Sequence, residues 1–359
     1  MVCGALMCKD EEAVIERCLR SMAEFVERFL ILDTGSTDNT LTIAKETLDD
    51  LGLPFQIMHR PFDTYAQSRT YLVKYAVQAA PWVLMIDADC TLSGGRPELP
   101  DSEIGLVEFI CDGVVSQRAV YLASHVDWRY ESGMTLDGRD LHEAVTADTP
   151  HHATRVHGIV MEHHGKAGDT RSSESDLAIL RELAERFPTN PRWLFYVAQT
   201  LKALGRRDEA MALYRECAIL GRLGDEWVWY CMFQSAVIAN DAHALLAACE
   251  MRPQRAEGWY ALACLLSNAS RYDLAMPIVT RAAGLPEPED SLFINRAVYR
   301  WGGRLELSVC LANNGMFEAA LHECTTLLQV DSLPEVVRRE VMSNAEQFRV
   351  QLHPEAVAQ

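Results

Sequence analysis

The sequence predicts an α/β domain with a mainly parallel sheet, followed by an all-α domain of helical repeats. Two observations support this prediction. Strand-like and helix-like segments alternate from residue 2 to residue 87, which is typical of a parallel sheet covered by helices. After residue 176 the apolar residues recur with helical spacing, and related segments follow one another toward the end of the chain.

The first domain is expected to contain three strand–helix units and a fourth strand. The predicted strands are VCGALMC, RFLILD, FQIMHR and WVLMID, and the predicted helices lie in EEAVIERCLRSMAEFV, STDNTLTIAKETLDDLG and YAQSRTYLVKYAVQAA. Parallel sheets bind ligands at the carboxyl ends of their strands. Functional residues are therefore expected at 9–12, 33–38 and 87–89.

The composition disfavours several partners. The chain has 33 basic and 51 acidic residues and a formal charge of −18, which repels nucleic acid and anionic lipid. It has no long apolar run, which predicts no secretory signal, no integral membrane association and a soluble, cytoplasmic protein. The 11 cysteines form no C-x-x-C pair, a pattern that favours reduced core thiols over zinc or disulfides.

The stretch WVLMIDADCTL places Asp87 and Asp89 at the end of a predicted buried strand. Two carboxylates this close need a cation or a proton between them. Three interpretations follow: a divalent metal that holds a phosphate-bearing substrate, an aspartate nucleophile beside an acid, or a solvated turn. A dinucleotide site is disfavoured because the first turn, MCKDEEAV, has no glycine fingerprint and carries carboxylates.

Four stretches, in order, carry a resemblance to a known family: KDEEAVIERCL, ILDTGSTDNT, YAQSRTYLVKYA with Arg69, and WVLMIDAD. Together they resemble the family-two glycosyltransferases of the GT-A fold. The resemblance covers roughly residues 1–165, and DTGSTDNT is its most specific part. The chain departs from the family where Asp10, Thr70 and Cys90 replace the usual Asn, Asn and Glu.

The resemblance implies a nucleotide-sugar donor, a UDP-sugar, and a role for each matching residue. Asp33 and Thr34 would contact the uridine, with Glu12 beside it. Asp87 would lie at the sugar and Asp89 would hold a metal on the diphosphate. Hard carboxylate and phosphate oxygens suit Mg²⁺ or Mn²⁺, and Arg69 would neutralise further charge.

The later polar stretches RDLHEAV and IVMEHHG supply two further candidates. An inverting transfer needs a base for the acceptor proton, and we expect Glu143 to be that base, with Asp137 and Asp140 as alternatives. By the resemblance, His163 completes the metal site. A phosphohydrolase of the haloacid dehalogenase type, with Asp87 as nucleophile and Asp89 as acid, is a rival interpretation of VLMIDADCTL. Its motif usually stands on the first strand, whereas three strand–helix units precede it here.

The predicted second domain contains three related segments, aligned on Gly205, Ser270 and Gly315. Each has an acid three residues later and an alanine two residues beyond that: Ala210, Ala275 and Ala320. This is the helix-turn-helix spacing of tetratricopeptide-like repeats. We place the domains at 1–170 and 171–359, with a linker in GKAGDTRSSESD, and expect the repeats to bind the acceptor or form a homodimer.

The sequence thus predicts an inverting, metal-dependent glycosyltransferase that transfers a hexosyl group to a protein or peptide side chain. Saccharide, lipid-linked or modified-nucleotide acceptors are the alternatives. A non-catalytic scaffold with a vestigial transferase domain is a second class, which the retained Asp87 and Asp89 disfavour.

Overall fold

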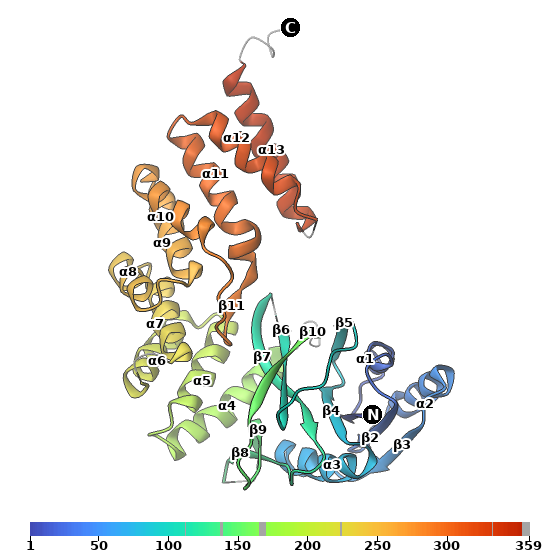
Figure 1. Ribbon diagram of the computed structural model, residues 1–359. Coiled ribbons are helices and arrows are strands. Elements are labelled where there is room, and N and C mark those ends of the chain that lie inside the picture. Colours follow the sequence, from blue (N-terminus) through green and yellow to red (C-terminus); the bar gives the residue numbers. More distant parts are fainter. Residues whose placement is uncertain (112, 137–138, 165–169, 223–224, 332, 354–359) are drawn as a thin grey trace. The chain divides into compact units, whose positions relative to one another are not determined.

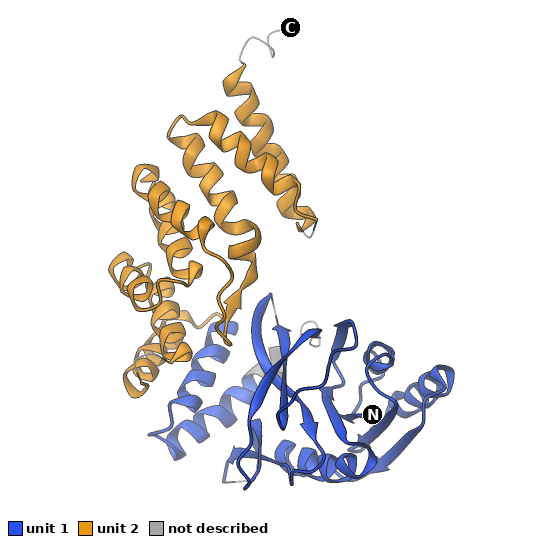
Figure 2. Cartoon of the chain, viewed as in Figure 1, with its two compact units in different colours: residues 1–204 blue, residues 205–359 orange. Residues whose placement is uncertain are grey.

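The chain forms two compact units, residues 1–204 and residues 205–359 (Figure 1, Figure 2). This computed structural model describes all residues except 112, 137–138, 165–169, 223–224, 332 and 354–359. The first unit contains the sheet and helices α1 to α5, and the second contains helices α6 to α13.

The elements of the first unit follow the predicted alternation and then continue into further strands. Its strands are β1 (Val2–Cys8), β2 (Arg28–Asp33), β3 (Phe55–His59), β4 (Trp82–Asp87), β5 (Cys90–Gly94), β6 (Ile104–Cys111), β7 (Val114–Ala123), β8 (Arg129–Met134), β9 (Asp140–Thr146) and β10 (Ala153–His163). Its helices are α1 (Ile15–Met22), α2 (Thr40–Leu51), α3 (Tyr65–Ala79), α4 (Thr170–Arg186) and α5 (Pro191–Ala203).

The main sheet has the strand order β3-β2-β1-β4-β7-β6-β10-β5. Strands β3, β2, β1 and β4 run parallel, and β7 joins them antiparallel to β4. Beyond β7, strand β6 is antiparallel to β7 and parallel to β10, while β8 and β9 pair as a separate antiparallel hairpin. The predicted α/β fold with a mainly parallel sheet is confirmed.

Side-chain alternation along the strands supplies a core on each face of the sheet. On one face, Leu6 and Ile31 pack with Leu19 of α1 and Leu48 of α2 in a buried cluster. On the other face, Ala5, Leu30 and Met85 pack with Leu72 and Val73 of α3. Because apolar residues point both ways, these central strands read as nearly continuous apolar runs in the sequence.

The carboxyl ends of the parallel strands meet, as their register requires. Cys8 of β1 lies opposite Asp33 of β2, and Met7 lies opposite Asp87 of β4. The loops that follow β1, β2 and β4 therefore share one edge of the sheet, where ligands of such folds bind.

Helices α4 and α5 pack against each other and belong to the compact unit of the sheet. Residues 165–169 of the expected linker lie outside the described residues. Helix α4 begins at Thr170, so the rest of that segment is helical rather than an extended linker. The domain boundary at residue 170 stays a prediction.

The second unit consists mainly of paired helices. They are α6 (Arg207–Leu220), α7 (Glu226–Ala239), α8 (Ala242–Met251), α9 (Ala256–Asn268), α10 (Tyr272–Gly284), the π-helix η1 (Val298–Gly302), α11 (Gly303–Asn313), α12 (Phe317–Leu328) and α13 (Glu335–Leu352), with the short strand β11 (Ile294–Asn295). Successive helices pack on one another, for example α9 on α10 and α11 on α12. The predicted helical-repeat region is confirmed.

The turns between helices explain the repeated sequence pattern. Gly205, Ser270 and Gly315 all have left-handed backbone, with φ of 77°, 57° and 77°. Glycine adopts this conformation without strain, which accounts for it at two of the three turns. The alanines five residues later, Ala210, Ala275 and Ala320, are fully buried, as close helix packing requires.

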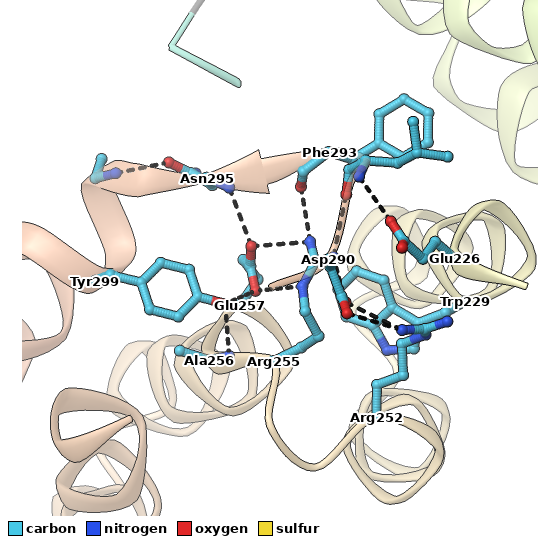
Figure 3. Close-up of polar contacts among 12 residues, drawn as sticks. Glu226, Trp229, Arg252, Arg255, Ala256, Glu257, Asp290, Phe293, Asn295 and Tyr299 are labelled. Carbon is cyan, nitrogen blue, oxygen red and sulfur yellow. Dashed lines mark hydrogen bonds and ion pairs between the residues drawn. The ribbon is translucent and has the colours of Figure 1, made fainter. Parts of the chain in front are cut away.

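A buried arginine fixes the irregular segment between α10 and η1 (Figure 3). Arg255 is fully buried, and its guanidinium donates to the carboxylates of Glu257 and Asp290 and to the carbonyls of Leu292 and Phe293. It also lies over the ring of Trp229, 4.3 Å from the ring centroid. Every N–H of the guanidinium has an acceptor, so the segment 290–293 is tied to α7 and α9.

Two expectations from composition can be compared with the structure. Nine of the 11 cysteines are buried, as expected for core residues, and none is paired in a disulfide. Their redox state stays a prediction. Among the described residues, no helix combines the length and apolar character needed to cross a membrane.

Candidate active site

A cavity of about 930 Å³ opens at the carboxyl ends of β1, β2 and β4. Its lining comes from five parts of the first unit: the ends of these strands, α3, β6 with β7, β9 with β10, and α5. The polar and aromatic lining residues are Lys9, Glu11, Thr34, Phe62, Tyr65, Arg69, Asp87, Asp89, Phe109, Cys111, Ser116, Gln117, Arg118, His142, Glu143, His163, Arg192 and Tyr196. Six of the eight residues predicted to act at the site line this cavity.

Arg69 of α3 joins two of the predicted residues. Its guanidinium pairs with Asp87 at the end of β4 and with Glu143 of β9, and all three side chains are largely buried. Arg118 of β7 adds a second cation on Asp87, with 3.0 Å between Nη2 and Oδ2. Burial opposes ionisation of Asp87, but the two guanidinium groups outweigh it and hold the pKa of this carboxyl far below its usual range.

Asp89 and His163 both line the cavity and contact each other directly. His163 Nε2 lies 3.1 Å from Asp89 Oδ2, while its Nδ1 lies 3.6 Å from the sulfur of Cys111. The hydrogen bond to Asp89 is the largest influence on the imidazole, and it raises the pKa of His163 to about 10. The structure thus brings together the two residues predicted to hold a metal.

The donor atoms of this pair fit a divalent ion. Carboxylate oxygen and imidazole nitrogen are both ligands of divalent ions in proteins, and Asp89 Oδ2 and His163 Nε2 lie 3.1 Å apart. Asp87, Asp89 and Cys90 also offer ligand atoms within 4.8 Å of one another. Burial raises the pKa of the Cys90 thiol well above its usual range, so this thiol stays protonated and is a poor ligand for Mg²⁺ or Mn²⁺.

The DTGSTDNT loop is held by its own first residue. The carboxylate of Asp33 accepts hydrogen bonds from the amides of Gly35 and Ser36, at 3.3 and 3.0 Å, and lies 3.3 Å from His59 Nδ1. Burial opposes ionisation, but the hydrogen bonds from Ser36 and His59 hold the pKa of Asp33 below its usual range. Thr34 and Asp33 are both buried, and only Thr34 is among the residues that line the cavity.

Asp10 connects this loop to the turn after β1. Its carboxylate accepts from the amide of Thr37 at 2.7 Å, and its own amide donates to Ser36 Oγ at 3.1 Å. Its φ of 53° lies in the left-handed region, which Asn and Asp tolerate better than most residues. The family's usual Asn and the Asp found here therefore satisfy the same backbone requirement.

Glu12 lies outside the cavity lining. Its carboxylate accepts from both the amide and the side chain of Asn39, at 3.0 and 2.9 Å, so it contacts the start of α2. The neighbouring Glu11 lines the cavity instead. A role of Glu12 beside the nucleotide stays a prediction.

One alternative base has a structural function, and another cannot be placed. Asp140 is buried, and its two oxygens accept from the amides of Tyr65 and Ala66 at 2.7 and 2.8 Å. It therefore caps the start of α3. Asp137 lies outside the described residues.

The sequence did not reveal several lining residues. Arg118 comes from an ordinary strand pattern in β7. Arg192 and Tyr196 belong to α5, which was assigned to the helical repeats. None of these residues stands in a recognisable motif, and only the fold places them beside Asp87 and Glu143.

Comparison with known proteins agrees with this geometry. Residues 5–133 match the model of glycosyl transferase family 2. The chain is 24% identical over 222 residues to the SPbeta prophage-derived glycosyltransferase SunS of Bacillus subtilis, which covers 59% of this chain and 51% of SunS. The chain thus spans about half the length of SunS. The first unit carries a family-two glycosyltransferase domain.

Proteins with tetratricopeptide repeats are also among the similar proteins. A TPR repeat-containing protein of Synechococcus elongatus is 31% identical over 85 residues, which covers 23% of this chain and 19% of that protein. Among solved structures, MamA of Desulfovibrio magneticus RS-1 aligns with a TM-score of 0.37 and 17% identity over 45% of this chain and 86% of that chain.

Proposed function

We propose that the protein is an inverting, metal-dependent glycosyltransferase that moves a sugar from a UDP-sugar to a protein or peptide side chain. The observation that carries this proposal is the convergence of Asp87, Asp89, Glu143 and His163 on one cavity at the strand ends of the family-two domain. A sugar diphosphate entering this acidic chain needs local positive charge, and Arg69 and Arg118 supply part of it.

Each of these side chains has a distinct task in the proposed reaction. Asp89 and His163 would hold Mn²⁺ or Mg²⁺, which when bound stabilises the charge of the departing diphosphate. Asp87, fixed by two arginines, would orient the sugar. Glu143 would take the proton of the acceptor as the acceptor attacks the anomeric carbon. Thr34 and the loop anchored by Asp33 would hold the uridine.

The acceptor and the helical unit belong to the same proposal. We propose that the helical repeats choose a protein or peptide acceptor or pair two copies of the chain, since such arrays present extended binding surfaces. A saccharide or lipid-linked acceptor is the competing possibility. Incubating the protein with Mn²⁺, a panel of nucleotide sugars and peptides that contain Ser, Thr or Cys would decide between them by mass spectrometry.

Metal-dependent donor binding is the first test. Calorimetry of UDP binding should show affinity with Mn²⁺ that falls strongly in chelator, because the diphosphate would otherwise face carboxylates. Asp89→Asn should also lose donor affinity and turnover. The control is Asp50→Asn, an exposed aspartate paired with Arg20 on the surface, which should change neither. Affinity that is indifferent to chelator and to Asp89→Asn would contradict the metal role.

The second test separates the base from the metal site. Glu143→Gln should lower the turnover number by roughly 10² to 10⁴ with little effect on UDP affinity, since proton removal matters in the transition state. Glu131→Gln, at an exposed position on the adjoining strand, serves as the matched control. Equal loss of donor binding in Glu143→Gln and His163→Ala would show that Glu143 supports the metal site rather than the acceptor proton.

A further inference from the structure

The wall of the cavity formed by β9 is irregular at the residue before Glu143. In the β8–β9 hairpin, Glu131 pairs with Ala144 and Gly133 pairs with Leu141. Two residues of β9, His142 and Glu143, therefore face the single residue Ser132 of β8. This is a β-bulge, and the φ of His142, 56°, places its first residue in the left-handed region.

The bulge changes where Glu143 points. In a regular strand, successive side chains point to opposite faces. Here the consecutive residues Leu141, His142 and Glu143 all line the cavity. Glu143 consequently reaches Arg69 and, through it, the end of β4. Without the extra residue, the strand would not present both His142 and Glu143 to the same space.

Left-handed backbone at histidine needs support, because glycine is the residue that adopts it freely. Helix α5 supplies that support. The ring of His142 stacks on Tyr196, with centroids 3.6 Å apart and planes 6° apart, and Arg192 Nη2 donates to the carbonyl of His142. Trp193 packs on the same hairpin, since a Cβ added at Gly133 would lie 2.5 Å from its Cζ2.

We propose that Arg192 and Tyr196 of α5 are positioning residues that clamp the His142–Glu143 bulge and so aim Glu143 at the acceptor. This inference rests on the proposed function, in which Glu143 is the base. It gives α5, a helix outside the sheet and its recognised motifs, a direct part in the transfer reaction. Both residues line the same cavity as Asp89 and His163, but no described contact joins them to either, so the proposal expects donor affinity to depend little on the clamp.

The clamp itself is tested without reference to activity. Hydrogen exchange of peptides that span residues 140–146 should become faster in Tyr196→Ala and in Arg192→Met, because the bulge loses its stack or its hydrogen bond. Arg207→Met, at an exposed arginine just beyond α5, is matched in charge and should leave this exchange unchanged. Unchanged exchange in both clamp variants would overturn the proposal.

Kinetics then test the consequence for transfer. Tyr196→Ala and Arg192→Met should each lower the turnover number about 10- to 100-fold, as small misplacements of a reacting group do. Their affinity for UDP with Mn²⁺ should stay within about threefold of wild type. Tyr196→Phe keeps the stacked ring and should recover most of the loss. A fall in UDP affinity that matches the fall in turnover would place α5 in the donor site and overturn the proposal.

A double variant and a pair of single variants distinguish loss of positioning from a general loss of structure. In Glu143→Gln protein, Tyr196→Ala should cause little further loss, because the group that it positions is already disabled. His142→Gly, whose backbone accepts a positive φ, should keep more activity than His142→Ala. Additive losses in the first combination, or equal losses in the second pair, would refute the clamp. If no sugar is transferred by the wild type, the proposed function fails while the exchange measurement still judges the clamp.

Discussion

Replacing Arg255 with Met should destabilise the helical unit severely. The substitution removes a fully buried cation and leaves Glu257, with 4% of its side chain exposed, and Asp290, with 12%, without that partner. The carbonyls of Leu292 and Phe293 also lose their donors. Removing one member of a buried ion pair costs about 3–5 kcal/mol, because the remaining charge stays in a poorly solvated site.

An unusually close control exists in the same unit. Arg271 precedes α10 as Arg255 precedes α9, and each pairs with an acid two residues later. The Arg271–Asp273 pair differs in exposure, with 54% and 62% of the two side chains open to solvent. Exposed pairs contribute about 0.2–1 kcal/mol, so Arg271→Met should have a small effect.

Hydrogen exchange resolves the two variants regionally. At about 1.36 kcal/mol per tenfold change, a loss of about 3–5 kcal/mol corresponds to hydrogen exchange that is about 2.2 to 3.7 orders of magnitude faster in peptides from α7 to α9. Peptides from β1 to β4 should be unaffected. If Arg255→Met accelerates exchange no more than Arg271→Met, the buried network does not stabilise this unit and the reasoning is refuted.

Three further predictions concern the first unit. Asp10→Asn should retain UDP binding whereas Asp10→Ala should weaken it in calorimetry, because only the former keeps an acceptor for the Thr37 amide at a left-handed position. Asp140→Ala should lower the free energy of unfolding by about 0.5–2 kcal/mol, because α3 loses a helix cap. The capping role would be contradicted if the folded variant lost as much turnover as Glu143→Gln. Gly133→Ala should cost about 1–3 kcal/mol in thermal unfolding, because its Cβ would meet Trp193, and an unchanged melting temperature would refute this contact.

The sequence predicted the first half of the site because that half depends on local patterns. Apolar strands that end in acidic residues identify the strand ends, and the parallel sheet brings those ends together. Asp87 and Thr34 could be placed on the cavity in this way. The prediction also extended to His163, although only the resemblance to a family, and no local pattern, pointed to it.

The remaining features depend on contacts between segments far apart in the chain. Arg118 reaches Asp87 only because β7 inserts beside β4. The bulge at His142 carries no glycine to signal its left-handed backbone, and its stabilising partners lie about fifty residues later in α5. Likewise, the carboxylates of Asp33 and Glu12 accept hydrogen bonds from backbone amides. Their position at strand ends predicted a ligand contact instead.

The repeated turns of the second unit bear on how such a chain can change length. Each helical pair has the same left-handed turn, at Gly205, Ser270 or Gly315. Each also has a buried alanine where its helices pack closely, at Ala210, Ala275 or Ala320. In arrays of this kind, each pair is stabilised mainly by its neighbours, so whole repeats can be gained or lost as modules. Because every residue that lines the cavity precedes Gly205, insertion or deletion of a repeat beyond the α5–α6 pair would leave the sequence of the first unit intact.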